Sequence, residues 1–151
     1  MDDYVLGISC FYHDSAATLI HNGEIVSAVQ EERFTRKKHD SSFPKNAVKY
    51  CLTSQSIDLR DIKSVVYYEK PLLTFERLLE SYLAAAPRGI RSFVVAMQVW
   101  LKEKLFLKSE FKKQLKLLQN ELAPNLSFQM PKFLFAEHHQ SHAAAAFYPS
   151  P

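Results

Sequence analysis

The amino-acid sequence predicts an α/β fold that opens with a three-stranded antiparallel meander and continues as a mixed sheet with helices. Two observations carry this prediction. Short runs of β-branched and aromatic residues alternate with longer stretches whose apolar residues recur at helical spacing. The pair Asn22-Gly23 separates two of the short runs, and both residues tolerate the positive φ of a tight hairpin turn.

Five segments are expected to form strands. The first three cover residues 4–10, 15–21 and 24–33, and they pair as a meander through the Asn22-Gly23 turn. A fourth strand is expected at residues 61–68, which include four consecutive β-formers, Val65-Val66-Tyr67-Tyr68. A short buried strand is expected at residues 132–136.

Helices are expected between and after these strands. Pro44 suits the first position of a helix that ends at residue 54 and carries one apolar stripe of Ala47, Val48, Cys51 and Leu52. A second helix covers residues 72–86. A long helical stretch covers residues 90–122, with a break expected near residues 107–109, and its lysines are interpreted as a solvated basic face. The last helix covers residues 138–147.

Composition narrows the class of protein. The 151 residues suffice for one modest domain, and the formal net charge of +3 is too weak to argue for a nucleic-acid partner. The two cysteines, Cys10 and Cys51, lack CxxC spacing, which favours a reducing cytosol over a disulfide framework. With only three glycines, no glycine-rich phosphate loop is available. An acidic start and the lack of a long apolar run lead us to expect a cytoplasmic protein without a membrane partner.

The most specific chemical signal is a histidine cluster after the last predicted strand. His138 and His142 are four residues apart in an alanine-rich, helix-favouring segment, so both rings project from one helix face. Two imidazoles on one face have the geometry of two ligands of one metal ion, whereas His139 points about 100° away. The alternative is a helix start that carries histidines without a ligand role, but three histidines within five residues favour the metal site. Catalytic metal sites usually have three protein ligands. We therefore expect the third ligand outside this sequence, which would then be the amino-terminal part of a larger enzyme.

Two further polar segments have both structural and functional interpretations. Residues 11–17, at the predicted turn between the first two strands, contain His13, Asp14 and Ser15. Asp14 would orient His13 and Ser15 would donate to a phosphate, or both would cap local backbone groups. Residues 30–40 form a dense charge run that contains Lys38. A solvated loop is its usual explanation, and an anion-binding loop is the functional alternative.

Together the three segments resemble the carbamoyltransferases of the nodulation-protein U and cephalosporin O-carbamoyltransferase type. They occur in the order of that family, and the resemblance is weakest between residues 71 and 131. It rests on Gly7-Ile8-Ser9-Cys10-Phe11-Tyr12-His13-Asp14-Ser15-Ala16-Ala17, on Gln30-Glu31-Glu32-Arg33-Phe34-Thr35-Arg36-Lys37-Lys38-His39-Asp40, on Glu137-His138-His139-Gln140-Ser141-His142-Ala143-Ala144 and on Ala146-Phe147-Tyr148-Pro149-Ser150-Pro151.

The resemblance implies the first half of an actin/hexokinase-like domain, the ASKHA or ribonuclease-H-like fold, with its second half and a YrdC-like carboxy-terminal domain lying outside this sequence. In such enzymes carbamoyl phosphate and ATP give a carbamoyl-adenylate, and the carbamoyl group passes to a hydroxyl of a small-molecule or saccharide acceptor, as in nodulation or secondary-metabolite biosynthesis. The fragment alone is expected to be inactive, and oligomerisation is left open.

By the same resemblance, His138 and His142 are ligands of a divalent metal, most commonly iron. His13 matches a catalytic histidine, and Asp14, Ser15 and Lys38 are expected to bind the substrate or the adenylate. Two alternatives stay open. In the first, the chain belongs to another ATP-binding branch of the actin-like superfamily, such as the proteins that make threonylcarbamoyl-adenosine in tRNA. In the second, it is a non-catalytic module of that fold.

Overall fold

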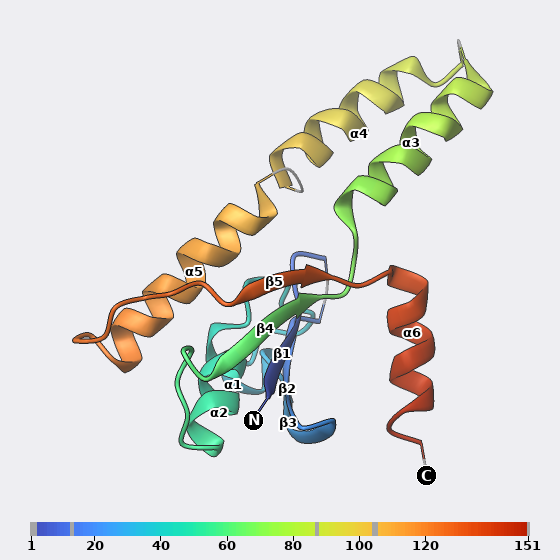
Figure 1. Ribbon diagram of the computed structural model, residues 1–151. Helices are drawn as coiled ribbons and strands as arrows, with labels where there is room; N and C mark the ends of the chain where they lie inside the picture. Colours follow the sequence, from blue (N-terminus) through green and yellow to red (C-terminus); the bar gives the residue numbers. More distant parts are fainter. Residues whose placement is uncertain (1–2, 13, 87, 104–105, 151) are drawn as a thin grey trace.

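The computed structural model describes residues 3–12, 14–86, 88–103 and 106–150. It contains one five-stranded mixed sheet with helices, which confirms the α/β class (Figure 1). The elements that follow each other along the chain are β1 Tyr4–Ser9, β2 Ala16–His21, β3 Glu24–Gln30, α1 Glu32–Thr35, α2 Lys45–Ser54, β4 Ile62–Tyr67, α3 Pro71–Ala85, α4 Ile90–Glu103, α5 Leu107–Leu122, β5 Lys132–Phe135 and α6 His138–Phe147.

The sheet has the strand order β3-β2-β1-β4-β5. Strands β1, β2 and β3 form the predicted antiparallel meander, and Asn22 and Gly23 turn between β2 and β3 with φ values of 50° and 93°. Strand β4 joins the other edge of β1 in parallel, and β5 joins β4 in parallel. The carboxyl ends of β1, β4 and β5 therefore meet at one edge of the sheet.

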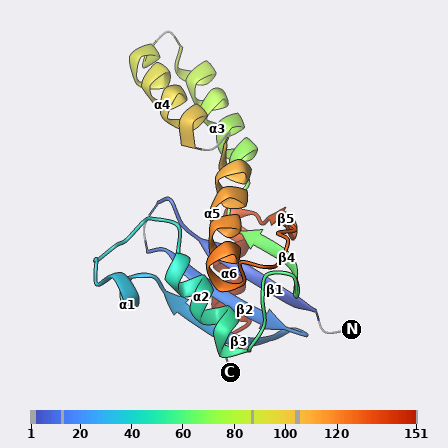
Figure 2. The ribbon, with the colours of Figure 1, turned by 90° about the vertical axis from the view of Figure 1, so that its left-hand side faces the viewer.

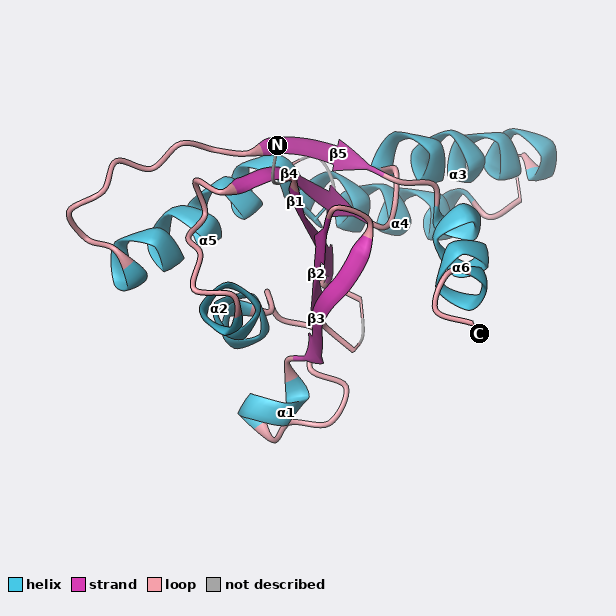
Figure 3. Cartoon of the chain, turned by 60° about the horizontal axis from the view of Figure 1, so that its bottom comes forward, coloured by secondary structure: helices cyan, strands magenta, loops and turns pink. Residues whose placement is uncertain are grey.

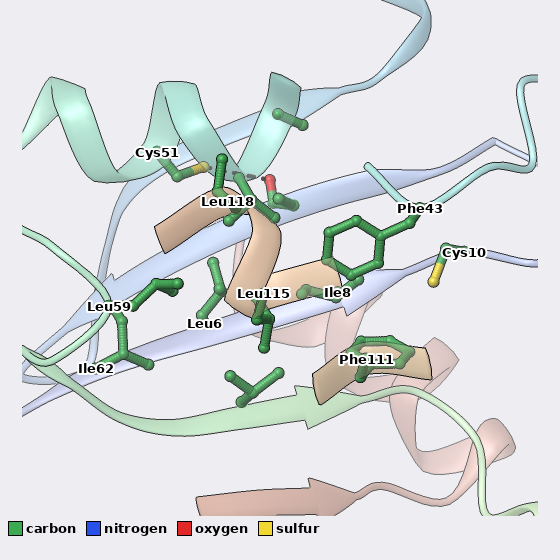
Figure 4. Packing of buried hydrophobic residues seen from close by; sticks show 14 of the residues in the cluster. Leu6, Ile8, Cys10, Phe43, Cys51, Leu59, Ile62, Phe111, Leu115 and Leu118 are labelled. Atoms are coloured by element: carbon green, nitrogen blue, oxygen red, sulfur yellow. Dashed lines mark hydrogen bonds between the residues drawn. The ribbon is translucent and has the colours of Figure 1, made fainter. Parts of the chain in front are cut away.

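The core lies between one face of the sheet and two helices. Figure 3 shows α2 and α5 on one side of the strands and α6 on the other. Figure 4 shows how side chains of α2, α5 and the sheet interdigitate. The fully buried members come from every one of these elements: Leu6 and Leu19 from the sheet, Val48 and Leu52 from α2, and Phe111, Leu115 and Leu118 from α5. The apolar stripe predicted for α2 is thus its buried face.

Helices α3 and α4 form a hairpin that projects away from the sheet, and α5 returns to it (Figure 2). The Tyr82 and Phe93 rings stack between the two helices with centroids 4.1 Å apart. The long helical stretch predicted over residues 90–122 is divided into two helices, but residues 107–109, where the break was expected, belong to α5: α4 ends at Glu103 and α5 begins at Leu107. The lysines of α5 are exposed, as the amphipathic pattern indicates.

The predicted end of the third strand is wrong. The third strand was expected to reach residue 33, but β3 ends at Gln30 and a short helix, α1, begins at Glu32. The reason is a buried carboxylate. Glu31 is only 2% exposed, and its side chain accepts hydrogen bonds from the main-chain N–H groups of Asn46 and Ala47 at the start of α2. The amides of Phe34 and Thr35 then bond back to the main-chain oxygen of Glu31, which turns the chain away from the sheet.

Among the described residues, none of the helices combines the length and the apolar composition that crossing a bilayer requires.

Candidate functional site

The polar segments singled out from the sequence gather at the edge where the parallel strands end. Residues 10–15 follow β1, residues 68–70 follow β4, and α6 follows β5 after two residues. Neighbouring strands lie about 4.8 Å apart, so the ends of β1 and β5 are separated by roughly 10 Å across β4. Open α/β sheets place their ligands at this edge, and the arrangement can be followed in Figure 1.

His138 and His142 lie side by side, one turn apart, at the start of α6. Their Nε2 atoms are 3.2 Å apart, and their ring planes cross at 84°. Two imidazole nitrogens on a tetrahedral ion would be about 3.3 Å apart, given metal–nitrogen bonds of roughly 2.0–2.1 Å. The distance is therefore compatible with two positions of one coordination sphere, and equally with a direct hydrogen bond between the two rings, both of which are exposed. Within the described part of the chain, no group of three candidate ligands surrounds a common point.

Helix α6 is attached to the sheet by contacts at its first turn. The Ser141 hydroxyl donates to the main-chain oxygens of Tyr68, at 3.1 Å, and Glu137, at 2.9 Å. Lys70 forms an ion pair with Glu137 at 2.8 Å, and this hydrogen bond lowers the pKa of the Glu137 carboxyl. The Glu137 carboxylate therefore faces Lys70. The ring of Tyr68 lies 5.6 Å from that of His138, centroid to centroid.

A small hollow of about 40 Å³ opens beside His138. Both cationic and anionic side chains line it, so it presents mixed charge and hydrogen-bonding groups to a polar ligand. Its lining residues are Glu69, Lys70, Leu73, Arg77, Glu137, His138 and His139.

The other two polar segments, far apart in the sequence, form one unit. The amide of Phe11 donates to the oxygen of Ser41 at 2.7 Å, and the amide of Ser15 donates to the oxygen of Asp40 at 2.8 Å. The Ser15 side chain is buried, and its hydroxyl donates to the main-chain oxygen of Ser42 at 2.5 Å. The turn after β1 (residues 10–12 and 14–15) is thus fastened to residues 36–42, which follow α1, and these two segments are together called the double loop.

A carboxylate–imidazole pair stands on this double loop. Asp14 Oδ1 lies 2.9 Å from His39 Nδ1, and both residues have left-handed backbone conformations, with φ of 47° and 55°. Lys38, the neighbour of His39, is exposed. The prediction for His13 falls outside the described residues. His39 was not singled out from the sequence, and the only signal there was its place in the charge run.

Comparison with known proteins places the chain among relatives that it matches over nearly its whole length. The sequence model of the carbamoyltransferase N-terminus family matches residues 4–151. An uncharacterized protein of Synechocystis sp. is 60% identical over 148 residues, which cover 98% of this chain and 23% of that protein. Nodulation protein NolNO of Sinorhizobium fredii is 31% identical over 137 residues, which cover 91% of this chain and 18% of that protein.

The chain therefore spans less than a quarter of the length of these two relatives. The match to the family nevertheless runs through β1, the double loop, the sheet and α6 without leaving out an element. A match of this extent shows that the chain belongs to the carbamoyltransferase N-terminus family.

Proposed function

We propose that the complete protein containing this chain is an ATP-dependent O-carbamoyltransferase. It transfers a carbamoyl group from carbamoyl phosphate, through a carbamoyl-adenylate, to a hydroxyl of a small-molecule or saccharide acceptor. The observation that carries the proposal is the family match over residues 4–151. The histidine pair where the parallel strands end supports it further, because a transferase of this kind needs a group that activates a carbonyl.

The fold supports an assignment to the first half of an actin/hexokinase-like domain. Such a half is expected to begin with an antiparallel meander and to add parallel strands beside its first strand. The order β3-β2-β1-β4-β5, with β4 and β5 parallel to β1, agrees with this expectation. The remainder of that domain and a YrdC-like domain that makes the adenylate would lie in the rest of the longer protein.

His138 and His142 are proposed to hold a divalent metal ion, with iron as the first candidate. The 3.2 Å between their Nε2 atoms is compatible with two adjacent ligand positions. Bound there, the ion would act as a Lewis acid towards the carbamoyl carbonyl. A third ligand would come from a part of the protein beyond these 151 residues.

Residues of the double loop have separate proposed roles in the transfer step. The acceptor oxygen bonds to the carbonyl carbon of the carbamoyl-adenylate while the bond from that carbon to the phosphate oxygen breaks, and AMP leaves with the electron pair. His13 is proposed to take the hydroxyl proton on a ring nitrogen. Lys38 is proposed to offset the negative charge on the departing AMP. Asp14 and Ser15 hold the loop that carries these groups, through the contacts to His39 and Ser42.

The test uses the complete protein, carbamoyl phosphate labelled in its carbonyl carbon, ATP and three hydroxyl acceptors: a chitin oligosaccharide, an aminoglycoside and a hydroxymethyl cephem. We expect label in at least one acceptor and AMP release that depends on carbamoyl phosphate. His142→Ala should reduce acceptor labelling by at least a hundredfold, whereas His21→Ala, at the end of β2 far from this site, should retain it. Equal labelling by the His142→Ala variant would refute the site, and absence of carbamoyl-phosphate-dependent AMP release would refute the activity.

A further inference from the structure

Most polar groups of the double loop are already used inside it. The Ser15 hydroxyl is buried against Ser42, and the Asp40 carboxylate accepts hydrogen bonds from the amide and the hydroxyl of Ser42 at 3.0 and 2.7 Å. The hydrogen bonds from Ser42 lower the pKa of Asp40, which keeps this carboxylate ionised and internally compensated. Several side chains reach solvent from this surface, among them those of Arg36, Lys37, Lys38 and His39, and the His39 side chain is 63% exposed.

The His39 ring is oriented from one side. Its Nδ1 atom faces Asp14 Oδ1 at 2.9 Å, so its Nε2 atom, at the far edge of the imidazole, is directed away from the carboxylate. The His39 amide also points to Glu32 Oε2, at 3.4 Å. Left-handed backbone conformations at Asp14 and His39 cost free energy in residues other than glycine. Here both partners of one hydrogen bond have such a conformation, which is typical of sites where a side chain must be held in one orientation.

The charge around this ring favours an anion. Arg36, Lys37 and Lys38 precede His39 in the sequence. The nearby carboxylates already have partners: Asp14 contacts the His39 ring, Glu32 accepts from the His39 amide, and Asp40 accepts from Ser42 and pairs with Lys37 at 4.0 Å. In its protonated form the imidazole donates from Nδ1 to Asp14 and from Nε2 to a ligand. A histidine held in this way, with an exposed lysine next to it in the sequence, suits the oxygens of a phosphoryl group, because hydrogen bonds between charged partners are about twice as strong as neutral ones.

We propose that His39, aimed by Asp14 and assisted by Lys38, binds the phosphoryl group of the substrate, and that Asp14 is a positioning residue rather than a direct ligand. This inference deepens the proposed carbamoyl transfer and rests on it. Two compounds of the proposed reaction carry such a phosphoryl group, the carbamoyl-adenylate and carbamoyl phosphate. Their stable counterparts, AMP and inorganic phosphate, are therefore the two probes of the test.

The variants are chosen to preserve the backbone. Asparagine tolerates left-handed φ better than most residues, so His39→Asn and Asp14→Asn remove the ring and the charge with little added strain. His21→Asn is the matched control, because His21 lies at the opposite end of β2 from the double loop. Binding of AMP and of phosphate to the complete protein is measured by calorimetry, and the ring nitrogens of His39 are followed by nitrogen-15 NMR.

We expect AMP to shift the His39 Nε2 signal and His39→Asn to weaken AMP binding by roughly tenfold or more, the usual effect of losing a hydrogen bond to a charged group. Asp14→Asn should weaken binding less and change the proton distribution between the two ring nitrogens even without ligand, which a purely structural role would not do. Phosphate that produces the same shift assigns the site to carbamoyl phosphate as well, and a shift with AMP alone assigns it to the adenylate.

Unaltered affinity of the His39→Asn variant for both probes overturns the inference, and so does an unshifted His39 ring in a protein that transfers carbamoyl groups. If AMP binding depends on His39 but the protein transfers no carbamoyl group, the phosphoryl site is supported and the proposed activity is refuted. The failure of the site and the failure of the activity are therefore distinguishable.

Discussion

The hydroxyl of Ser141 lies 3.1 Å from the main-chain oxygen of Tyr68, and this hydrogen bond joins α6 to the end of β4. Helix α6 contributes no buried side chain, so its direction depends on a few polar contacts at its first turn. Ser141 also lies between His138 and His142 in the sequence. The two imidazoles are therefore positioned relative to the sheet partly by a serine that does not face them.

Replacing Ser141 by alanine should weaken metal binding more than it weakens the fold. Partners that orient metal ligands typically contribute about 10- to 100-fold to affinity, so we expect a loss of roughly tenfold in Co²⁺ affinity, read from the visible absorption of the complete protein. The free energy of unfolding should fall by only about 1 kcal/mol, the value of one hydrogen bond. The exposed neighbour provides the control, Gln140→Ala. If both variants bind Co²⁺ alike, Ser141 does not orient the pair.

Glu31 should be the most consequential carboxylate for stability. It is buried and accepts hydrogen bonds from the main chain of Asn46 and Ala47 and from the Asn46 side chain, at 2.7–3.2 Å. Glu31→Ala removes these acceptors and leaves the start of α2 uncapped, which should cost about 2–4 kcal/mol in urea unfolding. Glu24→Ala, at an exposed position of β3, should change stability by less than about 0.5 kcal/mol. Similar losses in both variants would contradict the capping role.

The fold was predictable to the extent that its determinants are local. The stripe of Ala47, Val48, Cys51 and Leu52 predicted the buried face of α2, and all four residues are inaccessible to solvent. The Asn22-Gly23 pair predicted a turn that needs two positive φ angles, which both residues have. The end of β3 was not predictable, because Glu31 turns away to cap a helix that begins 14 residues later.

The candidate site likewise has one part that depends on local spacing and one that depends on contacts between distant segments. The spacing of His138 and His142 is a local property of a helix, and the structure brings their Nε2 atoms to 3.2 Å. Asp14 and His39 are 25 residues apart, and only the pairing of two loops brings them together. Local spacing carries no information about that pairing. The partner of a loop residue therefore had to come from the structure.

Phe111 should be the most sensitive core position. Its ring, fully buried on α5, makes edge contacts with those of Phe11, Phe43, Tyr67 and Phe133, which joins the double loop, the sheet and the helix. Phe111→Ala should lower the free energy of unfolding by about 3–5 kcal/mol, because it leaves a cavity as well as losing burial.

Chemical denaturation followed by circular dichroism measures this loss. Phe147→Ala is its control, since the Phe147 side chain is 76% exposed at the end of α6. A loss below about 1 kcal/mol for Phe111→Ala would mean that the rings around it close the cavity.

Glu121 should make the contact between α2 and α5 dependent on pH. Its carboxylate pairs with Lys45 at 2.5 Å and Lys49 at 2.8 Å, and these hydrogen bonds lower its pKa from 4.5 to about 2. A carboxyl whose pKa is lower in the folded than in the unfolded state stabilises the fold above its unfolded value and loses this effect as the pH falls. Glu121→Gln should therefore be slightly less stable than the natural protein at neutral pH. The difference should diminish between pH 4.5 and about 2.

Because all three side chains are partly exposed, the stability difference between the two proteins should also shrink in high salt. A difference that stays constant across this pH range would show that the ion pairs do not stabilise the packing of α5 on α2.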